Sequence, residues 1–195
     1  MKSTTTAFFL LVLVFGLGCG PGGDDVPATG ESQPEEPAAD VPKVEMLPTP
    51  FTAEQIRDEW VVGFNLIMLR KKHGRDVYQR WSVVEADGDS VRIEYVTVDA
   101  NGEPVAVPVQ RTATWVGLRN HAAFPAAVAT REEVTRDTPL GTLDGWLYTV
   151  QEHPPGTVTE YFFAKKYPGA PIQTLTTKDG EFVMDLSQVE RNYPE

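Results

Sequence analysis

The chain has 195 residues, a formal net charge of −11 and one cysteine. This acidic balance argues against a sequence-independent nucleic-acid binder, which needs a basic surface to replace counterions. A single cysteine excludes an intramolecular disulfide framework and any metal site built from several cysteines.

The first residues have the features of an export signal. Lys2 is the only charged residue among residues 1–19, and Ala7–Phe15 is almost entirely apolar before small residues follow. The apolar run is too short to cross a bilayer, which takes about 20 residues. We therefore predict a signal peptide over residues 1–18.

The end of this signal, Gly16-Leu17-Gly18-Cys19, resembles the site at which bacterial lipoproteins are acylated. That family has an aliphatic residue, a small residue, Gly or Ala, and then Cys; here the first two are exchanged. The resemblance implies that Cys19 carries lipid and holds the chain on a membrane. Because Gly20 is not Asp, it implies the outer membrane. Gly16 and Gly18 also fit an ordinary signal peptidase, which would leave the protein soluble in the periplasm or secreted.

An acidic stretch follows the cysteine. Residues 20–50 hold seven acidic side chains, one basic side chain, seven of the sixteen prolines and no aromatic residue. Such a composition cannot bury enough apolar surface to offset the entropy of ordering the chain. We predict that residues 19–50 are the lipidated cysteine and a disordered linker, and that residues 51–195 form a single domain.

The domain is predicted to begin with a long helix over residues 53–72. Thr52 and Gln55 have the spacing of a capping box, and Gly74 after His73 has the position of a helix stop. Further apolar residues widen the hydrophobic surface, so this helix must be covered on more than one side. Four large apolar residues recur on one helical face: Ile56, Trp60, Phe64 and Ile67.

After Gly74 the hydrophobic period falls from about 3.6 to about 2, which indicates strands. Prolines 104 and 108 restrict residues 105–109 to an edge strand, and Thr114 begins a short helix that ends near Phe124. Asp-Gly and Asn-Gly pairs supply hairpin turns. Strands are predicted over residues 77–85, 91–98, 105–109, 127–135, 144–152, 157–164, 171–177 and 181–188.

This order predicts an α+β fold. The long N-terminal helix packs on a curved, mostly antiparallel sheet of about seven or eight strands, since no alternation of strands and helices indicates a parallel sheet.

Two segments of the second half are similar to known envelope proteins. Thr138–Thr142 enters a strand that carries Trp146 and Tyr148, and Tyr161–Ala164 leads into the turn at Tyr167–Ile172. This pattern resembles relatives of the outer-membrane lipoprotein carrier and receptor, which are half-barrels closed by helices. The resemblance implies a half-barrel that can hold an apolar cavity, and it implies no reaction.

Catalytic patterns are missing from the sequence. No serine lies in a Gly-x-Ser-x-Gly elbow, and no phosphate-binding loop is present. His73, His121 and His153 lack the spacing of a metal site. We therefore predict no catalytic residue, no metal, no cofactor and no enzymatic activity.

Aromatic residues form the candidate ligand site. Alternate residues on two predicted strands share a face that the helix would meet, and a gap between sheet and helix would be an apolar pocket. The alternative is an ordinary filled core, because buried sheet faces have the same pattern. The six candidates are Trp60, Phe64, Trp146, Tyr148, Tyr161 and Phe163.

The sequence thus predicts a lipid-anchored, non-enzymatic protein of the bacterial cell envelope. Its partners would be the membrane, through the lipid, and a hydrophobic ligand or another envelope component; nucleic acid is excluded. A structural or protein-interaction module with a filled core, exported by an ordinary signal peptide, is the alternative. An envelope hydrolase has the least support.

Overall fold

The computed structural model describes residues 44–194. The predicted signal peptide, Cys19 and the linker up to residue 43 therefore lie outside the described residues. No helix within the described part is long and apolar enough to cross a membrane. The elements in chain order are α1 (Ala53–Glu59), β1 (Asn65–Lys72), β2 (Arg75–Ala86), β3 (Ser90–Val98), β4 (Val109–Thr114), α2 (Trp115–Asn120), β5 (Ala129–Thr138), β6 (Gly141–Glu152), β7 (Thr157–Ala164), β8 (Gln173–Lys178) and β9 (Glu181–Asn192).

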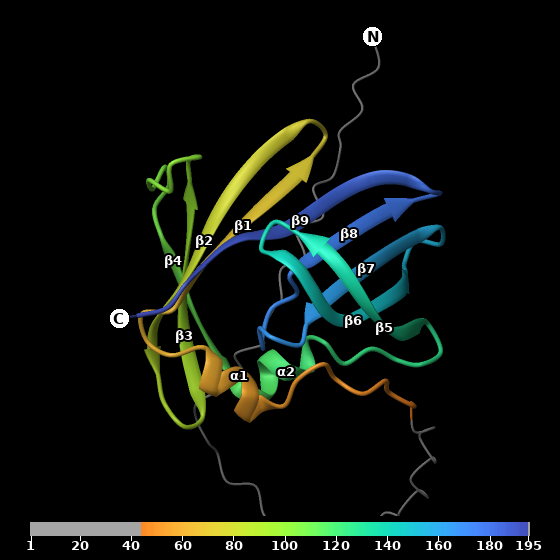
Figure 1. Ribbon diagram of the computed structural model, residues 1–195, viewed down its shortest axis with the longest axis horizontal. Coiled ribbons are helices and arrows are strands. Elements are labelled where there is room, and N and C mark those ends of the chain that lie inside the picture. The colour runs from red at the N-terminus through yellow and green to blue at the C-terminus, as the bar shows by residue number, and fades with distance from the viewer. Residues whose placement is uncertain (1–43, 195) are drawn as a thin grey trace, which may run out of the picture. The chain divides into compact units, whose positions relative to one another are not determined.

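All nine strands belong to one antiparallel sheet in the order β4-β3-β2-β1-β9-β8-β7-β6-β5. Two meanders, β1–β4 and β5–β9, are joined only where the first strand pairs with the last. The sheet curves so that β2–β4 and β5–β8 lie on opposite sides of β1 and β9 (Figure 1). Helices α1 and α2 lie side by side at one end of the curved sheet.

The predicted long helix over residues 53–72 is wrong, and so is the α+β fold class built on it. Helix α1 ends at Glu59, and Gly63 adopts φ +93°, a conformation that favours glycine and interrupts a right-handed helix. Residues 65–72 form β1 instead. The first half of this strand is buried on both faces, at Leu66, Ile67 and Met68, so its apolar residues do not alternate and resemble the wide apolar surface of a buried helix. The described part of the chain is nearly all sheet, with nine strands where about seven or eight were predicted.

The Gly74 stop is a hairpin turn rather than a helix end. Lys72 pairs with Arg75 across the two residues His73 and Gly74, which have φ of 50° and 72°. Two successive positive φ values are typical of a type I′ turn, the connection that matches strand twist.

The edge strand predicted at residues 105–109 is displaced along the chain. Pro104 makes only an isolated bridge with Val98, and the paired strand β4 begins at Val109. The valines before it, Val105 and Val107, are exposed. At the other edge of the sheet, β5 carries both acidic and basic side chains, which discourage pairing with a second chain.

The predicted starts of both helices are confirmed. Thr52 and Gln55 form the predicted capping box, and the Thr114 hydroxyl accepts from the Gly117 amide to cap α2. The predicted strand at residues 157–164 coincides with β7.

The main core lies on the inner face of the sheet, which we define as the face that carries Leu66, Val83, Ile93 and Phe163. The two helices cover one end of this face. Residues 44–51 also lie against the domain, since the Leu47 amide donates to the Phe124 carbonyl and Phe51 is buried. Contacts of the domain thus begin before the predicted boundary at residue 51. A second, smaller core contains Leu143, Leu147, Phe162, Ala164 and Ile172.

Candidate functional site

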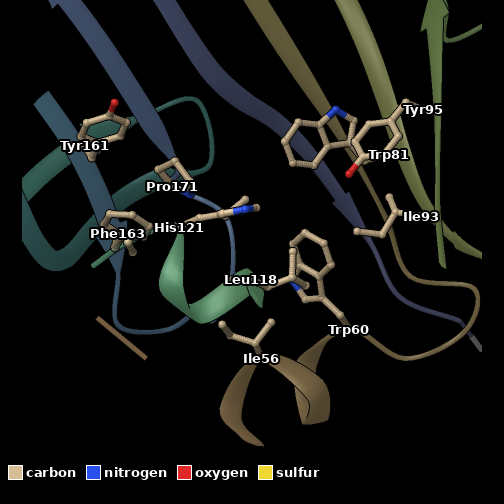
Figure 2. Close-up of a pocket in the computed structure, with 13 residues that line it drawn as sticks. Ile56, Trp60, Trp81, Ile93, Tyr95, Leu118, His121, Tyr161, Phe163 and Pro171 are labelled. Atoms are coloured by element: carbon tan, nitrogen blue, oxygen red, sulfur yellow. The ribbon is translucent and has the colours of Figure 1, made fainter. Parts of the chain in front are cut away.

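The inner face of the sheet is not completely filled. A cavity of about 320 Å³ lies between the two sides of the curved sheet and next to the two helices. Figure 2 shows its lining side chains converging from both sides. The lining is predominantly apolar and comprises Ile56, Trp60, Trp81, Ile93, Tyr95, Leu118, His121, Ala122, Tyr161, Phe163, Gly169, Ala170 and Pro171.

The floor of the cavity is set by Trp60, at the end of α1. Its indole is buried and donates a hydrogen bond from Nε1 to the Pro168 carbonyl at 3.1 Å. The next residue, Gly169, has φ +121°, and a side chain there would overlap the indole. Glycine therefore lets the β7–β8 loop approach Trp60 closely and fixes this wall.

The wall formed by β2 and β3 consists of Trp81, Ile93 and Tyr95. The Trp81 and Tyr95 rings meet edge to face, with centroids 5.2 Å apart. Burial raises the pKa of Tyr95, while the positive charge of Arg111 opposes that rise. Trp81 Nε1 donates to Gln79 Oε1 at 2.8 Å, so its polar atom is satisfied and the ring faces the cavity as an apolar surface.

The opposite wall comes from β7. Tyr161 stacks on Phe124 with centroids 5.1 Å apart, and its hydroxyl donates to Glu152 Oε1 at 2.9 Å. Burial raises the pKa of Tyr161, and the nearby Glu152 carboxylate raises it further. The tyrosine is therefore neutral at ordinary pH and contributes its ring to the wall.

The structure separates the six predicted aromatics into two groups. Trp60, Tyr161 and Phe163 line the cavity. The predicted pairing across β6 and β7 is present, since Trp146 lies opposite Phe163 and Tyr148 opposite Tyr161.

The other three aromatics fill core space beside the cavity. Tyr148 is fully buried and donates to the Pro48 carbonyl. Trp146 contacts Phe51 and lies under the Arg131 guanidinium, whose carbon is 4.9 Å from the ring centroid. Phe64 is buried beside Trp60 and Tyr193.

Sequence reasoning missed the wall from β2 and β3 and the contribution of α2. The alternation of Trp81 with Val83 and of Ile93 with Tyr95 showed that each pair shares a strand face. It did not show that this face lies opposite β7, because that placement depends on the pairing of β1 with β9.

The chemistry of the cavity is that of apolar contact. Among the described residues, no group of three or more His, Cys, Asp or Glu side chains is arranged to hold a metal ion. His121 borders the cavity but is solvent-exposed, and His73 lies in the β1–β2 turn. Rings and aliphatic side chains on all sides favour a hydrophobic group as occupant.

Comparisons with known proteins find only a distant likeness to solved structures. No protein-family model matches the sequence, and no curated protein matches it. Among solved structures, a Bacteroides fragilis protein described as exported, with a YmcC-like fold, has a TM-score of 0.43 and 7% identity over 68% of this chain and 97% of that one.

MucB of Pseudomonas aeruginosa, solved in complex with MucA, has a TM-score of 0.48 and 14% identity. A second structure of MucB has the same score with 12% identity. The match to the complex covers 72% of this chain, which spans 53% of the MucB-containing chain. Likeness at this level concerns the course of the backbone and transfers no function.

Proposed function

We propose that this chain is a non-enzymatic protein of the bacterial cell envelope, held to the outer membrane through Cys19, and that it binds a hydrophobic ligand in the cavity on its inner sheet face. The observation that supports this proposal most directly is the apolar cavity of about 320 Å³. This volume lies at the lower end of the range of about 300–1,000 Å³ that is usual for small-molecule sites.

Ligand binding can be tested with the neutral fluorescent probe N-phenyl-1-naphthylamine. The full chain carrying Cys19→Ser, released from cells without detergent, is titrated with the probe. We expect a saturable rise in fluorescence and a higher melting temperature with bound probe, because a ligand that binds only the folded state stabilises it.

Cavity-filling variants decide whether the probe enters this cavity. Ala122→Phe and Ala170→Phe each place a ring into the lining from a different wall, and each should weaken binding by at least about tenfold, which equals about 1.4 kcal/mol. Ala127→Phe, at an exposed alanine outside the lining, is the matched control and should bind normally. If all three variants bind the probe with equal affinity, the probe does not enter this cavity. That result, or the absence of saturable binding by the Cys19→Ser chain without further substitutions, would favour the filled-core interaction module instead.

The lipid anchor has a separate test. Cys19 is the only cysteine, and a signal-like segment precedes it. A single acyl chain binds membranes marginally, whereas several chains hold a protein stably. Cys19→Ser should therefore move the protein from the membrane to the soluble fraction, while Gly22→Ser should not.

The choice of membrane depends on the residue after the cysteine. Gly20→Asp should shift the protein from the outer to the inner membrane on a density gradient. Membrane association that survives Cys19→Ser would contradict the anchor and favour an exported soluble protein, whatever the outcome of the probe titration.

A further inference from the structure

Building on the proposed ligand-binding function, we propose that the ligand is a single-chain amphiphile with an anionic head group. Its chain occupies the apolar cavity, and Arg111 and Gln79 bind its head at the side of the cavity formed by β2–β4.

A second hollow adjoins the cavity on the same face of the sheet. It has a volume of about 280 Å³ and is lined by Gln79, Tyr95, Thr97, Val107, Val109 and Arg111. Tyr95 lines both spaces, and Arg111 is the cross-strand partner of Ile93, which lines the cavity. A ligand that passes Tyr95 therefore leaves apolar surroundings and meets polar side chains.

The charge of this polar end is positive. Among residues 44–194, no Asp or Glu side chain lines either space, and Arg111 makes neither an ion pair nor a side-chain hydrogen bond there. By contrast, Arg92, on the neighbouring strand, pairs with Glu85. The sequence from residue 104 to residue 131 contains no acidic residue, although the chain has 28 of them.

Gln79 adds hydrogen-bond donors to this end. Its Oε1 accepts from Trp81 Nε1 at 2.8 Å, which orients the amide, and the two Nε2 hydrogens are available as donors. An arginine guanidinium and an amide donor together suit an oxyanion, because hydrogen bonds to a charged acceptor are the stronger kind. Carboxylates and phosphate esters share this chemistry.

The cavity volume limits the apolar part of the ligand. A group the size of a water molecule or a methylene occupies roughly 30 Å³. The cavity of about 320 Å³ therefore holds on the order of ten such groups. One chain of medium length fits this space, and two long chains do not.

The head group can be tested by displacing N-phenyl-1-naphthylamine from the full Cys19→Ser chain with four ligands of equal chain length. These are dodecanoate, dodecyl phosphate, dodecanol and dodecyltrimethylammonium. We expect both anions to bind at least about tenfold more tightly than the alcohol and the cation. Arg111→Gln should reduce the difference between dodecanoate and dodecanol to less than about twofold.

The matched control is Arg92→Gln, which removes an arginine from the adjacent strand and should leave the preference for anions intact. Circular dichroism and the urea midpoint verify that both variants are folded. If dodecyl phosphate binds more tightly than dodecanoate, the head group of the ligand is a phosphate ester. If dodecanoate binds more tightly, the head group is a carboxylate. Either result supports the proposal.

Two outcomes would overturn the proposal while leaving the proposed function in place. One is equal affinity for dodecanol and both anions in a chain that binds the probe. The other is an anion preference that persists in Arg111→Gln. A chain that binds neither the probe nor any dodecyl compound would contradict the proposed function itself.

Discussion

Tyr161 shows how one side chain of the cavity wall links burial to pH. Its hydroxyl donates to Glu152, and burial together with that carboxylate raises its pKa above the ordinary value near 10. Below pH 10 the tyrosine is protonated in both the folded and the unfolded chain. Above it, the unfolded chain loses the proton first, so the free energy of unfolding falls as pH rises.

We therefore expect that in Tyr161→Phe the free energy of unfolding falls less steeply as the pH rises above 10. At neutral pH the variant should cost about 0.5–1.5 kcal/mol for the lost hydrogen bond. Glu152→Gln should also make this fall less steep, because it removes the carboxylate charge that raises the pKa of Tyr161. Urea unfolding between about pH 8 and pH 11.5 measures both effects; an unchanged slope in both variants would contradict the assignment.

Arg191 is the second residue whose effect can be predicted. Its side chain is only 3% exposed, and it donates to Glu59 Oε1 at 2.7 Å and to Gln188 Oε1 at 2.8 Å. The guanidinium also lies between aromatic rings, 4.8 Å from the centroid of Phe64 and 4.7 Å from that of Tyr167. It thereby fastens the end of α1 to β9.

Arg191→Met should lower the free energy of unfolding by about 3–5 kcal/mol, because it leaves Glu59 partly buried without its cation. The double variant Glu59→Met and Arg191→Met should lose less, since no charge is left unpaired. Arg57→Ala breaks an exposed pair with Asp58 and should cost less than about 1 kcal/mol. Urea denaturation compares the three, and a double variant less stable than Arg191→Met would refute the account.

At the scale of elements, β1 replaces the last part of the long helix that the sequence predicts, and a tight turn joins it to β2. The turn residues His73 and Gly74 both have positive φ. His73→Asn should stabilise the domain by a few tenths of a kcal/mol to about 1 kcal/mol, because asparagine tolerates this conformation better. Gly74→Val should destabilise it by about 1–2 kcal/mol.

The control for this turn is Gly88→Ala. A methyl group at either glycine meets nothing within 4 Å, but only Gly74 of the two has a positive φ. Gly88→Ala should therefore change stability by less than about 0.5 kcal/mol. If Gly88→Ala lost as much stability as Gly74→Val, the positive φ of Gly74 would not be the cause of the loss in Gly74→Val.

The elements differ in how far the sequence predicts them. Turns depend on a few adjacent residues, and Thr52, Thr114 and the Asp87-Gly88 pair were predicted correctly for that reason. Strand β1 was not predicted, because Leu66, Ile67 and Met68 are all buried. A strand that is covered on both faces shows no alternation of apolar and polar residues. Ile56 belongs to α1 and Ile67 to β1, while Trp60 and Phe64 lie in the connection between them, so the helical spacing of these four residues does not reflect one helix.

The candidate site was predictable in part for the same reason. Tyr161 and Phe163 alternate along one strand, and each lies opposite its predicted partner on β6. Trp81 and Tyr95 lie opposite these two residues because the whole sheet curves. No local sequence pattern predicts that curvature.

At the scale of the whole molecule, β9 is the one strand among residues 44–194 that joins the second meander to the first, through its pairing with β1. A chain that stops after Gly180 lacks β9, so β1 and β8 lose their shared neighbour and the cavity loses the alignment of its walls. We expect this truncation to abolish cooperative thermal unfolding and probe binding together. Calorimetry checks the first and fluorescence titration the second; a sharp transition in the truncated chain would contradict this prediction.

The pairing of β1 with β9 also has a consequence in time. A chain is made from its N-terminus, so β1 must wait with one edge unpaired until the last strand has been synthesised. The nine-stranded sheet therefore cannot be complete before β9 is available to pair with β1.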